Sequence, residues 1–279
     1  MLQQPSALSA LQQLLQRQGT ALPSLAASLL SLPAAAGEQA AQQITEQPGM
    51  LPALARLLQL SGSASSDLQF AVQTCQELMK HSAAAQRMAA EPAIVAGLLW
   101  VVRAAGTGES RTAITRTIAF HACQAAIALH KLAALPGSSV SPEQQLSITA
   151  VPAGLLRSSR DWMMRQEGLG ALMHMVQPVP VHAGDRAARQ LAALPGFLRD
   201  VVQLLASTPA ADEASAMRAI FVVRRLMDHD DHGSCRAEVI AQLAADKAAV
   251  AAIVRTMNCS DADFGSMTCE VFMLLARGP

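Results

Sequence analysis

The stretch PGMLPALARLL at residues 48–58 returns as PGFLRDVVQLL at residues 195–205. Both copies start with a Pro-Gly break and continue with apolar residues spaced i, i+3, i+6 and i+7, the pattern of one face of an amphipathic helix. A weaker copy consists of Val250, Ile253 and Met257, and a further copy is AGLL at 153–156, which repeats AGLL at 96–99. The copies start near residues 8, 51, 95, 152, 198 and 250.

The copies follow one another at intervals of 43 to 57 residues. A period in the forties is typical of an α-solenoid built from units of two or three helices. The longest interval contains SSVSPEQQLSITAV, which we interpret as an insertion at about 138–151. Within it, Ser141, Pro142 and Glu143 predict a helix start, with serine as the N-cap and proline at the first helical position.

The residues around each break predict the rest of the unit. A short Ala/Gln/Arg segment such as EQAAQQITEQ precedes the break, and a loop followed by a longer helix such as DLQFAVQTCQELMKH comes after it. This three-helix unit resembles the armadillo repeat, with HEAT repeats as close relatives. The resemblance implies an all-α, right-handed α-solenoid of about six armadillo/HEAT-like repeats, forming a single domain over residues 1–279.

The composition agrees with an all-α class. The 279 residues are 51% hydrophobic but only 3% aromatic, with no Tyr, and helix-forming Ala, Leu and Gln are abundant. There are 21 basic and 21 acidic residues, split 8 to 7 before residue 151 and 13 to 14 after it. Because neither half has a basic surplus, binding to nucleic acid gets no electrostatic support.

The sequence carries only weak signals for membrane insertion, organellar import or an oxidising compartment. The longest apolar run, AIVAGLLWVV at 93–102, is too short to span a membrane. Five cysteines with no C-x-x-C favour a reducing compartment such as the cytoplasm. The first 37 residues have no Asp or Glu, as in an organellar transit peptide, but they contain only one arginine, Arg17. The sequence therefore favours the cytoplasm over organellar import.

No catalytic motif stands out, and we expect no cofactor and no enzyme activity. The segment DHDDHGSC at 228–235 is rich in metal-ligand side chains, but a solvated loop after a helix is the favoured interpretation. Cys75, Cys123 and Cys269 occupy similar places in long helices, which indicates packing rather than nucleophilic catalysis.

The family resemblance implies that the long third helices line a concave groove that contacts protein partners. We aligned these helices on Leu78, Leu172 and Leu226, taken as equivalent buried leucines. The groove-facing residues are then Gln73, Glu77, Lys80, Glu167, Ala171, His174, Phe221, Arg225 and Asp228. Where peptide-binding members of the family have a groove asparagine, this chain has Glu77, Ala171 and Arg225, so recognition of basic peptides in the importin manner is not supported.

The predicted function is a non-catalytic scaffold or adaptor that binds a protein partner along its concave surface. The alternatives are an RNA-binding solenoid, which needs regular periods and usually a basic surplus, and a metal-dependent site at 228–235. The chain ends on apolar VFMLLARGP, residues 271–279. A dimer mate, the chain's own fold or further residues would cover this end, so self-association through the C-terminal helix is one expectation.

Overall fold

The computed structural model describes nine stretches of the chain. They are residues 5–17, 22–60, 66–106, 116–158, 161–177, 181–208, 212–228, 234–257 and 262–277. All regular secondary structure within these stretches is helical, which confirms the all-α class. The chain divides into two compact units, unit 1 at Met1–Val151 and unit 2 at Pro152–Pro279. That the whole chain is a single repeat domain stays a prediction.

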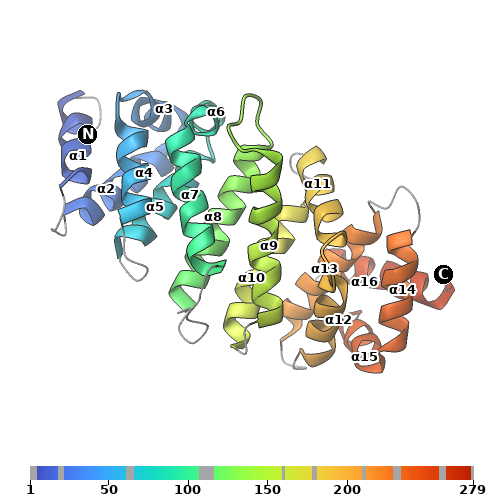
Figure 1. Ribbon diagram of the computed structural model, residues 1–279. Helices are drawn as coiled ribbons and strands as arrows, with labels where there is room; N and C mark the ends of the chain where they lie inside the picture. The colour runs from blue at the N-terminus through green and yellow to red at the C-terminus, as the bar shows by residue number, and fades with distance from the viewer. Residues whose placement is uncertain are drawn as a thin grey trace. The chain divides into compact units, whose positions relative to one another are not determined.

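Unit 1 repeats the order of short, medium and long helices that the sequence predicted. Its helices are α1 (Pro5–Leu15), α2 (Leu22–Ala36), α3 (Glu38–Glu46), α4 (Met50–Leu60), α5 (Ser66–Leu78), α6 (Ser82–Ala90), α7 (Pro92–Gly106) and α8 (Arg116–Ala133). Second helices α1, α4 and α7 lie side by side (Figure 1), and so do third helices α2, α5 and α8. Each three-helix repeat thus buries its apolar stripes against the neighbouring repeats.

Unit 2 also repeats sets of three helices in which the third is the longest, but the first is longer than the second, with 12 against 11 residues and then 12 against 10. Helix α9 (Pro142–Ser158) runs through the division between the units, and the remaining helices are α10 (Trp162–Val176), α11 (Val181–Ala192), α12 (Phe197–Ser207), α13 (Glu213–Asp228), α14 (Ser234–Ala245), α15 (Lys247–Thr256) and α16 (Ala262–Arg277). Third helix α13 packs between α10 and α16, and second helix α12 packs on α15. Arg157 of α9 pairs with the buried Asp200 of α12 at 2.7 Å, which anchors α9 in this unit.

The Pro-Gly breaks explain why the chain turns where it does. Gly49, Gly137 and Gly196, each after a proline, have φ of +80°, +72° and +74°. This left-handed conformation is strained for residues with a Cβ atom, so glycine is favoured there. Helices α4 and α12 begin immediately after two of these breaks, as the sequence predicted.

The expected repeat start near Pro152 is wrong, because Pro152 lies inside the continuous helix α9. The helix starts ten residues earlier, where the predicted signal is confirmed: the Ser141 hydroxyl accepts the Gln144 N–H at 3.2 Å, and the Gln144 side chain accepts the Ser141 N–H at 2.7 Å. This reciprocal capping box satisfies two backbone donors. Residues 142–151 of the predicted insertion therefore form the first part of a long helix.

Candidate functional site

The predicted contact residues of α5 lie along its solvent-facing side. Gln73 and Lys80 are exposed and Glu77 is half-buried, whereas the reference residue Leu78 is fully buried. The Lys80 ammonium lies 2.6 Å from the Glu77 carboxylate. The two charges offset each other, and the uncharged amide of Gln73 lies one turn before Glu77 on the same side of the helix.

Helix α8 extends this surface with residues that the sequence analysis did not select. Phe120 is 40% exposed, and Arg116, one turn earlier, is also exposed. The side-chain amides of Gln76 on α5 and Gln124 on α8 are hydrogen-bonded, so these faces of the two helices adjoin. We call Gln73, Arg116, Phe120 and Gln124 the unit 1 third-helix surface.

In unit 2, α10 has an exposed side formed by Met163, Glu167 and His174. These residues are spaced i, i+4 and i+11, which keeps them on one helical face. Ala171, which the alignment placed among the contact residues, is only 2% exposed. Ala171 is part of the core, and Gly170, which is half-buried, lies on the exposed side of α10 in its place.

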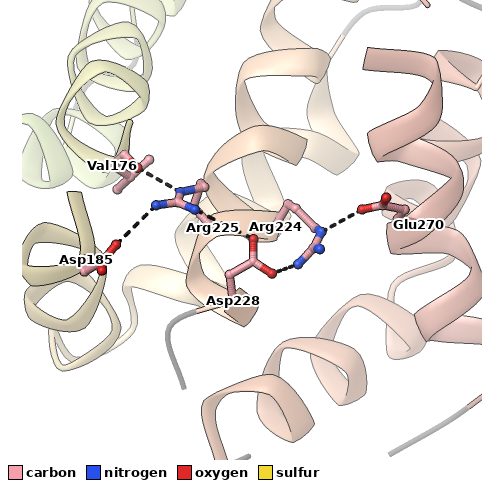
Figure 2. Close-up of polar contacts among 6 residues, drawn as sticks. All are labelled: Val176, Asp185, Arg224, Arg225, Asp228 and Glu270. Carbon is pink, nitrogen blue, oxygen red and sulfur yellow. Dashed lines mark hydrogen bonds and ion pairs between the residues drawn. The ribbon is translucent and has the colours of Figure 1, made fainter. Parts of the chain in front are cut away.

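On α13, Phe221 is half-buried, while two further predicted contact residues bind other groups of the protein. Figure 2 shows Arg225 and its neighbour Arg224 both directed at Asp228. Arg224 also pairs with Glu270 of α16 at 3.2 Å. Asp228 is therefore paired with two arginines of its own helix, and Arg225 also contacts other helices, which makes both weaker candidates for partner contact than Phe221.

Arg225 joins three helices. Its Nε donates to the Val176 carbonyl, at the end of α10, at 2.9 Å, and its guanidinium lies 3.3 Å from the carboxylate of Asp185 in α11. Burial lowers the pKa of Arg225; the Asp185 carboxylate opposes this shift and Arg224 adds to it. An arginine with this basicity stays charged at neutral pH, so the link to Asp185 persists.

Unit 1 has a similar arrangement built around a histidine. The Nε2 of His81 lies 2.8 Å from the Ala34 carbonyl in the last turn of α2, and its Nδ1 lies 3.5 Å from the carboxylate of Glu38, the first residue of α3. As with Arg225, one side chain contacts the end of the preceding third helix and an acidic residue on the following short helix. We call each arrangement a joint.

The start of α13 is fixed by a half-buried polar cluster. Asp212 accepts the Ser215 N–H at 3.1 Å, and its other oxygen accepts Trp162 Nε1–H at 3.0 Å and the Gln166 amide at 2.7 Å. Burial raises the pKa of Asp212, but the hydrogen bonds from Ser215, Gln166 and Trp162 outweigh burial and hold the pKa below its ordinary 3.8.

This cluster predicts an acid-sensitive contribution to stability. Because the folded pKa of Asp212 is lower than the unfolded one, its contribution is present above pH 3.8 and is lost as the pH falls through the lowered folded value. Asp212→Asn keeps an oxygen for the N-cap bond, so we expect a flatter stability profile between about pH 5 and about pH 2, measured by urea denaturation. If the two proteins lost the same free energy of unfolding as the pH falls, this assignment would be contradicted.

Other sequence candidates for chemistry fall in two groups. The metal-ligand cluster at 228–235 lies largely outside the described residues; within the described part, no three His, Cys, Asp or Glu side chains are placed to hold a metal ion. Cys75 and Cys123 are buried, and burial raises the pKa of the Cys75 thiol to about 12. A thiol with that pKa is protonated at neutral pH, as expected for a packing residue.

No family model and no curated protein sequence matches the chain. Among solved structures, an engineered protein aligns with 97% of this chain and 99% of its own at a TM-score of 0.65 and 18% identity. A designed armadillo repeat protein aligns with 96% of this chain and 99% of its own at a TM-score of 0.64 and 14% identity.

The chain has an armadillo-like repeat fold. Another designed armadillo repeat protein, solved in complex with the peptide (KR)4, covers the same shares of both chains at a TM-score of 0.62 and 14% identity. At such low identity the likeness concerns the arrangement of helices alone. Across the described residues, no helix of this armadillo-like chain combines the length and apolar character needed to cross a bilayer.

Proposed function

We propose that this protein is a non-catalytic interaction scaffold whose armadillo-like units bind a linear segment of a protein partner. The observation that carries the proposal is the unit 1 third-helix surface. There, a 40% exposed aromatic side chain, Phe120, lies one helical turn before Gln124, whose side-chain amide is hydrogen-bonded to Gln76 of α5. Exposed aromatic residues surrounded by polar groups are typical of positions that contribute most to protein binding.

The chemistry of this surface suits a segment with apolar side chains and little net charge. Phe120 offers an apolar contact, and Gln73 offers an amide that can both donate to and accept from a peptide backbone. The acidic Glu77 is already paired with Lys80. A strongly basic ligand such as the (KR)4 peptide bound by the designed protein would therefore have to compete with Lys80 for Glu77.

Unit 2 offers a surface of a different kind. Met163, Glu167 and His174 on α10 combine an exposed thioether with one acidic and one imidazole side chain. Phe221 on α13 adds an aromatic ring that is half-buried. We assign the stronger binding contribution to unit 1. Phe120 is more exposed than Phe221, and Arg225, next to Phe221 on α13, is bonded to neighbouring helices.

The proposal is tested by selecting linear peptides from a phage-displayed random library on the purified full chain and measuring their affinity by calorimetry. Phe120→Ala should weaken binding of the selected peptides by about tenfold or more. Trp100→Ala is a matched control, because Trp100 is 39% exposed but lies on second helix α7. Failure to enrich any peptide, or equal losses in both variants, would refute the proposed binding surface.

A further inference from the structure

Helix α2 carries a stripe of exposed leucines. Leu25, Leu29 and Leu32 are 57%, 52% and 69% exposed, and their i, i+4 and i+7 spacing places them on one helical face. The helix packs on α1, α3 and α5 through its other sides. Apolar side chains gathered in this way, rather than scattered singly, mark a surface that another molecule covers.

The stripe lies on the side of α2 that faces away from α5. Thr74 of α5 donates its hydroxyl hydrogen to the Ala27 carbonyl at 2.9 Å, so Ala27 marks the side where α5 packs. Leu25 and Leu29 are each two residues from Ala27, which corresponds to about 200° around the helix. Third helices in unit 1 pack side by side, and the stripe occupies the place where one more helix would continue that row.

The charge pattern indicates what kind of helix would pack there. Neither α1 nor α2 contains an Asp, Glu, Lys, Arg or His residue. A partner recognised through its charges would find no complementary group on either helix, whereas a second copy brings an equally uncharged face and no like-charge repulsion. The second copy also brings leucines at matching spacing, which can interdigitate as they do between packed helices.

We infer that the leucine stripe of α2 is a self-association surface, on which two copies of the chain pack α2 against α2 around a two-fold axis. Such an interface is isologous, since each copy contributes the same patch. Three leucines per copy cover much less than the roughly 800 Å² per partner of a stable interface, so the dimer should be weak and depend on concentration. This surface is distinct from the C-terminal helix and does not depend on the proposed peptide binding.

The test is sedimentation equilibrium of the full chain from about 10 µM to about 1 mM, the range in which a weak dimer forms. The average mass of the wild-type protein should rise from 29.3 kDa toward twice that value. Leu29→Glu should raise the dimer dissociation constant by at least about tenfold, because a carboxylate would be buried without a partner. If Leu29→Glu unfolds by circular dichroism, Leu32→Gln at the most exposed of the three positions replaces it.

Met273→Glu is the control, because Met273 is 49% exposed on α16, far along the chain from α2. It should associate as the wild-type protein does. A wild-type mass that stays at 29.3 kDa throughout would overturn the inference. So would association that Met273→Glu abolishes and the stripe variants leave intact, since this would place the contact at the C-terminal helix.

Discussion

Replacing Gly168 with alanine is expected to destabilise unit 2 by about 1–3 kcal/mol, the usual cost of forcing an extra methyl group into a packed core. A Cβ atom at Gly168 would lie 2.8 Å from the backbone carbonyl oxygen of Pro152 and 3.2 Å from the Cβ of Leu155. A backbone carbonyl cannot rotate away as the end of a flexible side chain can. The helices α9 and α10 would have to move apart at this point of close approach.

Gly154→Ala provides the matched control within the same pair of helices. A Cβ atom there meets no atom within 4 Å, and the residue lies in the helical stretch Pro142–Ser158. Alanine should therefore stabilise α9 by about 0.5–1 kcal/mol through its better helix propensity. Both variants are measured by urea denaturation of the full chain, and a neutral or stabilising Gly168→Ala would show that the two helices can separate at little cost.

The second large effect is expected for Arg225→Ala, a loss of about 2–3 kcal/mol. The substitution removes the donor to the Val176 carbonyl and the partner of the Asp185 carboxylate, and the Arg225 side chain is only 16% exposed. Buried groups left without partners cost more than the original hydrogen bonds contributed. Arg225→Lys should recover little of the loss, because an ammonium lacks the planar fork that reaches both acceptors.

Arg224→Ala separates this effect from a general loss of charge. Arg224 pairs with Asp228 and Glu270, but Glu270 is 50% exposed, and solvent-exposed ion pairs contribute about 0–1 kcal/mol. A double-mutant cycle with Asp185→Asn measures the coupling within the joint directly. Equal losses for Arg224→Ala and Arg225→Ala, with no coupling to Asp185, would contradict the assignment.

The repeat architecture could be predicted from local signals because each repeat break has a backbone requirement. Gly49 and Gly196 both adopt a positive φ, and the helix that follows each of them begins within one residue. Ser141 caps α9 as predicted, because the N-cap hydrogen bond depends only on residues three positions apart. Signals of this kind are contained in a few consecutive residues and can be recognised without knowing the tertiary packing.

Features that depend on neighbouring helices were not predictable. Pro152 resembles a break but lies within α9, where tertiary packing overrides the local preference for a helix end. Aligning Cys75 with Cys123 would place His121 at the position of Gln73, yet His121 is 3% exposed and Phe120 occupies the exposed side. An alignment error of one residue rotates the assigned position by about 100° around the helix. Such an error can therefore assign a buried residue to the surface.

For the same reason, only some of the predicted contact residues lie at the surface, and their role in binding stays a prediction. Gln73, Glu167 and His174 lie on accessible or half-buried sides of their helices, whereas Ala171 is buried. Arg225 was assigned as a contact residue because it directly precedes the reference leucine Leu226, as Glu77 precedes Leu78. Its bonds to Val176 and Asp185 come from residues 49 and 40 positions away, which no local pattern could indicate.

The two joints have a consequence for how repeats of this kind diverge. The contact requires a nitrogen donor that reaches a helix-end carbonyl and lies next to a carboxylate. The imidazole of His81, just before α6, and the guanidinium of Arg225, within α13, both meet this requirement from different positions of the repeat. Selection can then preserve the contact while the amino acid that makes it changes from one repeat to the next. Successive copies of an ancestral repeat would lose their sequence similarity well before they lose their structural similarity.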